Sequence, residues 1–128
     1  MPVRPVYLDH AATTPVRPEV LEAMLPYLGS GAFGNPSSAH HFGRTARAGI
    51  EQARRQVATA VGAEPNQVVF TSGGTEADNL AIIGSALAAR NRGRPMRVVT
   101  SAIEHKAVLA AAHHVVTLGG EEEVLPVD

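Results

Sequence analysis

The stretch from residue 67 to residue 100 constrains the fold of this 128-residue chain more than any other feature. A run of β-branched and aromatic residues at 67–71 ends in two adjacent glycines, and apolar residues then recur at helical spacing over 77–88. A second short apolar run follows at 97–100. Because strands that alternate with helices are joined by right-handed crossovers, this order predicts an α/β fold with a mostly parallel sheet and flanking helices.

The rest of the chain extends this pattern on both sides. The proline-rich residues 1–16 predict an extended N-terminal arm that ends in a turn at 11–15. The expected helices are 18–28, 44–61 and 105–113, and the further strand candidates are 115–117 and 123–125. The loop at 29–43 is long for a compact region, and such loops are more often functional than idle. The acidic run at 121–123 is interpreted as a solvated turn.

Composition excludes several classes of function. The chain is 45% apolar and 18% charged with a net charge of -1, which leaves no basic footprint for nucleic acid or an anionic membrane. It contains no cysteine and therefore forms no disulfide, thiolate metal site or cysteine nucleophile of its own. No apolar run reaches the roughly 18–20 residues of a membrane helix, and the N-terminus lacks the apolar stretch of a signal peptide. We therefore expect a soluble, cytoplasmic chain with at most one core.

The strongest local signal is the glycine turn at residues 71–79, with the sequence TSGGTEADN. Gly73 and Gly74 let the main chain pass close to a ligand, and a helix that starts near Thr75 directs unpaired N–H groups at the turn. The turn therefore predicts a phosphate site, to which the Thr75 hydroxyl adds a donor. A plain capped turn, with Thr75 and Asp78 at capping-box spacing, is the alternative. The P-loop lysine and the third dinucleotide-binding glycine are absent, so ordinary ATP or dinucleotide binding is not predicted.

His105 follows the next predicted strand, in the sequence SAIEH at 101–105. Ligands of a parallel sheet bind beyond the carboxyl ends of its strands, so the glycine turn and His105 are expected to face one crevice. There the imidazole could stack on a flat cofactor or move a proton. A surface residue at the start of a helix is the alternative.

Three other features have weaker functional interpretations. The polar loop at 34–43 could line a substrate mouth or form a solvated connector. The adjacent histidines at 40–41 and 113–114 lack the spacing of a common zinc site, so no metal is predicted. Asp9 and His10 suggest a hydrolytic triad, but no serine lies in a nucleophile elbow and this hypothesis fails.

Four motifs occur in order along the chain: YLDHAATTP at 7–15, GNPSS at 34–38, FTSGGTEADN at 70–79 and EHKAV at 104–108. Together they resemble the cysteine desulfurases of nitrogen fixation and iron–sulfur cluster assembly, within the pyridoxal-phosphate enzymes of aminotransferase class V. The resemblance covers essentially the whole chain but only the N-terminal third of such an enzyme. It implies part of the large domain of a PLP-dependent transferase of fold type I, with 1–16 as the arm and 17–128 as an incomplete PLP-binding large domain.

The resemblance also implies a role for each matching residue. Gly74 and Thr75 match the positions that hold the phosphate of pyridoxal 5'-phosphate, and His105 matches the histidine that stacks on its ring and assists proton transfer. Four further residues match segments that lie near the active-site entrance in this family: His10, Ala12, Thr13 and Asn35. The implied reaction removes sulfur from L-cysteine, leaves L-alanine and forms an enzyme persulfide. The implied partners are a second copy in a homodimer and an iron–sulfur scaffold or other sulfur acceptor.

The chain departs from this family in what it lacks. In relatives the Schiff-base lysine, the aspartate on the pyridine nitrogen, the substrate-binding arginine and the sulfur-accepting cysteine all lie beyond the position of Asp128. Lys106 is the only lysine and is expected on a helix surface. The chain is therefore predicted to be a fragment or one part of a split enzyme, inactive by itself. Selenocysteine lyase or another class V enzyme, and a non-catalytic phosphate-binding remnant, are the alternatives.

Overall fold

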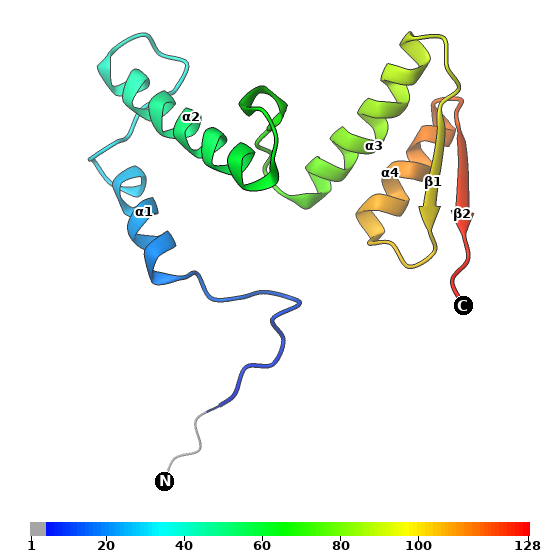
Figure 1. Ribbon diagram of the computed structural model, residues 1–128, viewed down its shortest axis with the longest axis horizontal. Coiled ribbons are helices and arrows are strands. Elements are labelled where there is room, and N and C mark those ends of the chain that lie inside the picture. Colours follow the sequence, from blue (N-terminus) through cyan, green and yellow to red (C-terminus); the bar gives the residue numbers. More distant parts are fainter. Residues whose placement is uncertain (1–4) are drawn as a thin grey trace. The chain divides into compact units, whose positions relative to one another are not determined.

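The computed structural model describes residues 5–128. The chain forms two compact units, one ending at Val68 and the other spanning Val69–Asp128 (Figure 1). The first unit holds the N-terminal arm and two long helices. The second unit holds two further helices and the sheet.

The N-terminal arm is extended and has one turn. Residues 5–17 form neither helix nor strand, and the turn lies at 10–12, slightly earlier than expected. Tyr7 stabilises this turn, because its hydroxyl donates to the carbonyl oxygen of Asp9 at 2.8 Å. The Tyr7 ring also meets the His10 ring edge-on, with 5.0 Å between their centroids. The arm is thus held by contacts within itself.

The first unit contains the helices α1 (Pro18–Leu28) and α2 (His41–Val61), followed by the short 3-10 helix η1 (Pro65–Gln67). Pro18 occupies the first position of α1, where its missing N–H removes no intrahelical bond. Gly62 follows the last residue of α2, and its φ of 68° lets its N–H bond back to the carbonyls of the last helical turn. Both expected helices are confirmed, and α2 begins three residues earlier than the apolar spacing suggested.

The second unit is a strand–helix–strand element preceded by a helix. Its elements are α3 (Gly74–Asn91), β1 (Arg97–Ser101), α4 (Lys106–Thr117) and β2 (Glu121–Leu125). The two strands are parallel, with Arg97 opposite Glu121 and Ser101 opposite Leu125. This confirms the α/β class with a parallel sheet and flanking helices.

Within residues 5–128 one cluster of buried apolar side chains is found, and it lies in the second unit. Its buried members are Ala86 of α3, Met96 just before β1 and Val115 of α4. Around them pack Ile82, Ile83, Leu87, Val98 and Leu118. Burial of these side chains holds α3 and α4 against each other and against the sheet.

The expected strand at 67–71 is wrong. Gln67 ends η1, and residues 68–71 have no regular secondary structure. The sheet found in the described part of the chain contains β1 and β2 alone. A strand needs a neighbouring strand with which to share main-chain hydrogen bonds, and no strand within residues 5–128 pairs with this segment.

Two more local predictions are wrong in the second unit. Residues 115–117 continue α4, because Val115 is fully buried in the core and packing there overrides the strand preference of its β-branched side chain. The acidic run at 121–123 begins β2 instead of forming a turn. Glu123 is stabilised in the strand by an ion pair with Arg97 of β1 at 2.5 Å.

Candidate functional site

α3 begins directly after the glycine turn, and Glu76 ties the helix to the turn. Gly73 precedes the helix and Gly74 is its first residue. The Glu76 carboxylate accepts hydrogen bonds from the Ser72 hydroxyl at 2.6 Å and from the Ser72 N–H at 2.7 Å. Both bonds lower the pKa of Glu76 below its usual value, and the bond from the Ser72 hydroxyl has the larger effect. The carboxyl group is therefore ionised at neutral pH.

Two further side chains stabilise the main chain of the turn. The Thr71 hydroxyl donates to the Gly73 carbonyl at 3.1 Å, and the Asn79 amide donates to the Thr75 carbonyl at 2.7 Å. Thr71, Glu76 and Asn79 are not among the site residues predicted from the sequence. The available signal was their type and spacing, because short polar side chains within a few residues of a turn commonly bond its main chain.

The first N–H groups of α3 have no intrahelical acceptor. The earliest main-chain bond of the helix runs from the Ala77 N–H to the Gly73 carbonyl at 3.1 Å. The N–H groups of Gly74, Thr75 and Glu76 precede it and therefore lack a partner within the helix. Unpaired N–H groups at the positive end of a helix dipole favour an anion.

The residues around these N–H groups are exposed. Gly73 and Gly74 are exposed, and a Cβ added to either would meet no other atom within 4 Å. Thr75 is exposed as well, and its hydroxyl has no hydrogen-bond partner among the residues that the structure describes. A phosphate could approach these donors without displacing any side chain, so the residues present fit the phosphate of the implied cofactor.

The alternative interpretation of the turn, a capping box between Thr75 and Asp78, is wrong. Thr75 is the second helical residue, and the residue in the capping position is Gly73, which has no side chain. The capping residue therefore gives no side-chain hydrogen bond to the first turn of α3. The Thr75 hydroxyl is therefore not used to cap its own helix.

His105 is the capping residue of α4. Its Nδ1 accepts a hydrogen bond from the Ala107 N–H at 3.2 Å. Because Nδ1 accepts this bond, we assign the proton of the neutral ring to Nε2. His105 is exposed, so Nε2 is the ring atom left for a ligand. Lys106 is exposed at the first position of α4, as expected for a helix surface.

The glycine turn and His105 lie toward the same end of the second unit. Figure 1 shows that α3 and α4 both begin at the end where β1 and β2 finish. The two helices are also in contact with each other. The topology therefore brings the predicted phosphate-binding residues and the predicted ring-stacking residue to the carboxyl end of the parallel sheet.

The other predicted site residues lie in the first unit and make local contacts. His10, Ala12 and Thr13 lie in or beside the turn of the arm, where the Ala12 N–H donates to the Asp9 carbonyl at 3.1 Å. The side-chain oxygen of Asn35 accepts the N–H two residues further on at 2.9 Å, which closes a turn in the loop. A role for these four residues at a substrate entrance stays a prediction.

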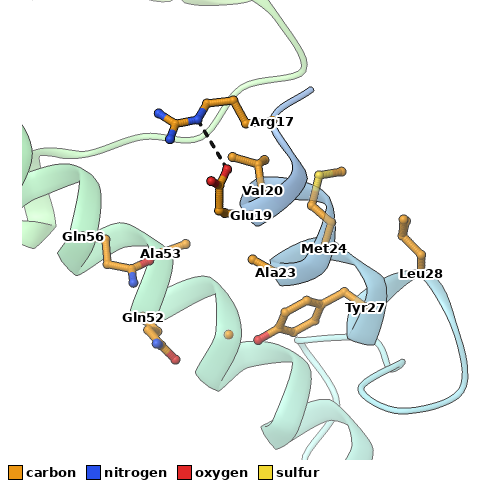
Figure 2. A pocket seen from close by; sticks show the side chains of 11 residues that line it. Arg17, Glu19, Val20, Ala23, Met24, Tyr27, Leu28, Gln52, Ala53 and Gln56 are labelled. Atoms are coloured by element: carbon orange, nitrogen blue, oxygen red, sulfur yellow. Dashed lines mark ion pairs between the residues drawn. The ribbon is translucent and has the colours of Figure 1, made fainter. Parts of the chain in front are cut away.

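A groove of about 570 Å³ lies between α1 and α2 in the first unit. In Figure 2 the Tyr27 ring projects from α1 toward α2. Gly49 of α2 makes room for it, because a Cβ there would lie 2.6 Å from the ring. Arg17 and Glu19 form an ion pair of 3.5 Å beside the groove. None of the predicted site residues lines this groove.

Two further properties bear on the class of site. Within residues 5–128, no three side chains of the histidine, cysteine, aspartate and glutamate types are grouped as metal ligands would be. No helix in this part of the chain is both long and apolar enough to cross a membrane.

Residues 6–128 match the family model for aminotransferase class-V. The chain belongs to this class-V family. Curated relatives in the family include cysteine desulfurase IscS of Dictyoglomus turgidum, 54% identical over 125 residues, and IscS of Methanosarcina thermophila, 52% identical over 123 residues. These alignments cover 98% and 96% of this chain but 31% and 30% of the relatives. This class-V chain thus spans about a third of the length of the curated relatives that it matches.

Solved structures agree with this class-V assignment. A NifS-like protein matches with a TM-score of 0.82 and 38% identity, over 96% of this chain and 33% of that protein. SspA in complex with cysteine matches with a TM-score of 0.80 and 41% identity, over 93% of this chain and 33% of SspA. The resemblance to cysteine desulfurases and the expected fold are therefore confirmed.

Proposed function

We propose that this chain supplies the cofactor-phosphate site of a cysteine desulfurase, which uses pyridoxal 5'-phosphate to convert L-cysteine to L-alanine. The observation that carries the proposal is the start of α3, where the first N–H groups have no intrahelical acceptor and belong to exposed residues beside two glycines. An anion site of this kind is what a cofactor phosphate requires. Identity of 54% to an IscS enzyme supports the choice of reaction.

In the proposed mechanism, this chain binds and orients the cofactor. The N–H groups of Gly74 and Thr75, together with the Thr75 hydroxyl, donate to the phosphate. The imidazole of His105 stacks on the cofactor ring and holds or moves a proton at Nε2, because its Nδ1 is engaged by the Ala107 N–H. The cofactor, when bound, supplies an electron-withdrawing ring that weakens bonds in the amino-acid substrate.

The proposal requires groups that residues 1–128 do not contain. The chain has no cysteine to accept sulfur as a persulfide, and its single lysine is exposed beside His105. We infer that the cofactor-binding lysine and the sulfur-accepting cysteine come from sequence outside these residues, in a cytoplasmic homodimer that passes sulfur to an iron–sulfur scaffold or other acceptor. Residues 1–128 alone are then inactive toward L-cysteine.

Expression of the complete reading frame that contains residues 1–128 tests this function. We expect a visible absorbance band when pyridoxal 5'-phosphate is added, and conversion of L-cysteine to L-alanine in the presence of a thiol reductant. Absence of the band would favour a non-catalytic phosphate-binding remnant. Turnover of selenocysteine without turnover of cysteine would replace the proposed activity with that of a selenocysteine lyase.

A substitution at Thr75 tests the phosphate turn itself. Thr75→Ala removes one donor to a charged group and is expected to weaken cofactor binding by about 1 kcal/mol or somewhat more. Equilibrium dialysis of the complete protein measures this change. Thr45→Ala is the matched control, because the Thr45 hydroxyl donates to the His41 carbonyl in α2 at 3.1 Å. Equal cofactor affinity of the Thr75 variant and the wild type would show that this hydroxyl does not contact the phosphate.

A further inference from the structure

Glu76 makes an unusual contact for an acidic residue beside a proposed phosphate site. It is the third residue of α3, from which a glutamate commonly reaches back to the N–H of the capping residue. Here the carboxylate reaches one residue further, to the N–H and the hydroxyl of Ser72, at 2.7 and 2.6 Å. One side chain of the helix thus holds both donors of the residue that enters the glycine turn.

These bonds restrict the main chain of the turn. Gly73 and Gly74 have no Cβ to limit their dihedral angles. The main chain that joins Ser72 to α3 could therefore adopt many conformations if no side chain held it. The Glu76 carboxylate bonds Ser72, the residue before Gly73. The Thr71 hydroxyl donates to the carbonyl of Gly73 itself at 3.1 Å. The two contacts together limit the directions in which the following N–H groups can point.

Attraction to the helix dipole does not by itself explain the contact. A carboxylate near the start of α3 is favoured by the dipole but repels a phosphate bound at the same end. The observed carboxylate bonds Ser72, outside the helix, and leaves the N–H groups of Gly74 and Thr75 unoccupied. The contacts therefore favour a role in ordering the turn over competition for its donors.

We infer that Glu76 is the positioning residue of the phosphate turn, holding Ser72 so that the unpaired N–H groups of α3 are already oriented toward the cofactor phosphate. The inference rests on the proposed function, because it requires the phosphate to bind at this turn. Donors that are ordered before binding give higher affinity, since less of the interaction free energy is lost in ordering them.

The test compares Glu76→Ala with Glu76→Gln in the complete reading frame, by measuring the dissociation constant of pyridoxal 5'-phosphate. Glu76→Ala removes both bonds to Ser72, and we expect affinity to fall about tenfold, which corresponds to about 1.4 kcal/mol. Glu76→Gln keeps an acceptor oxygen at the same place, and we expect it to restore affinity to within about threefold of the wild type. Rescue by glutamine separates a hydrogen-bonding role from an effect of charge alone.

Pyridoxal, which lacks the phosphate, gives the second measurement. We expect its affinity to be the same in the wild type and both variants, because the turn contacts only the phosphate. Glu19→Ala is the matched control, since Glu19 is an exposed acid in the first turn of α1 and its loss changes the net charge equally. This variant is expected to bind both compounds as the wild type does.

The possible outcomes separate the inference from the proposed function. Tighter cofactor binding by both Glu76 variants would show competition with the phosphate, and unchanged binding would show no role, so either result overturns the inference alone. If the wild type does not bind the cofactor, the proposed function itself is wrong. Should Glu76→Ala fail to fold, Ser72→Ala removes the shorter bond and is expected to weaken binding about threefold. Unchanged affinity in Ser72→Ala would then overturn the inference.

Discussion

At the scale of single residues, histidine side chains cap both α2 and α4. His40 and His105 each accept a main-chain hydrogen bond through Nδ1, from Gly43 at 3.3 Å and from Ala107 at 3.2 Å. Serine, threonine, aspartate and asparagine are the usual capping residues, and the imidazole takes their place here. For His105 this means that one side chain combines a structural contact with a proposed contact to the cofactor.

Substitution of His105 can separate these two contacts. His105→Ala loses the cap and is expected to lower the free energy of unfolding by about 1 kcal/mol, whereas His105→Asn keeps a capping oxygen and is expected to cost less. In the complete enzyme both variants should turn over L-cysteine more slowly with the cofactor still bound, since both lack the ring. Urea unfolding and steady-state kinetics measure the two effects. Wild-type turnover in His105→Asn would remove the ring from the mechanism.

Thr100 of β1 carries a buried hydroxyl without a hydrogen-bond partner among residues 5–128. Valine has the same shape and no polar atom, so Thr100→Val is expected to raise the free energy of unfolding by about 1 kcal/mol. Thr117→Val is the contrasting variant, because the exposed Thr117 hydroxyl donates to the His114 carbonyl at 2.7 Å and its loss should not stabilise the chain. Urea unfolding followed by circular dichroism compares them. Destabilisation by Thr100→Val would show that the hydroxyl is satisfied, for example by a buried water.

At the scale of elements, the surroundings of a helical glycine decide whether it stabilises or destabilises the folded chain. Gly43 is buried in the first turn of α2, where a Cβ would lie 2.3 Å from the carbonyl oxygen of Ser38. Gly84 lies within α3, and a Cβ there would meet nothing within 4 Å. The first glycine lets a loop pack against a helix, whereas the second only weakens the helix.

The same substitution at these two glycines should therefore have opposite effects. Gly84→Ala is expected to raise the free energy of unfolding by about 0.5–1 kcal/mol, because alanine favours the helix. Gly43→Ala is expected to lower it by about 1–3 kcal/mol, because main-chain atoms must move to admit the methyl group. Thermal unfolding of the two variants gives the comparison. A change of the same sign in both would contradict this account of the two helices.

At the scale of the whole molecule, much apolar surface is left uncovered. α1 has no buried residue, although its sequence is that of an amphipathic helix. In the sheet, Val99, Val124 and Leu125 are each about half exposed, at 52%, 47% and 47%. Exposed apolar patches and unpaired strand edges of this kind favour association with other protein surfaces.

Residues 1–128 purified by themselves are therefore expected to self-associate at micromolar concentration. Light scattering coupled to size exclusion should give a mass above the 13.4 kDa of the monomer. Val99→Lys places a charge on the exposed apolar surface of the sheet and is expected to reduce the association. A single 13.4 kDa species for the unsubstituted chain would show that its exposed apolar residues do not drive association.

The sequence by itself determined the features that depend on neighbours along the chain. The apolar spacing of 18–28 and 77–88, and the glycines that start α3, predict helices and an anion-binding turn because helical hydrogen bonds and glycine dihedral angles are local. The four motifs were likewise sufficient to predict the family and to select Gly74, Thr75 and His105 as candidate site residues. The roles of these residues toward a cofactor stay predictions.

Only the tertiary structure decided which apolar runs become strands and how the glycine turn is held. Residues 67–71 and 115–117 have the same β-branched character as β1. No strand in the described part of the chain pairs with the first segment, and the second contributes Val115 to the core. Strand formation depends on a partner distant in sequence, which no local pattern specifies. The bonds from Glu76 to Ser72 also required coordinates, because the sequence places a glutamate four residues after a serine but does not show which groups its carboxylate reaches.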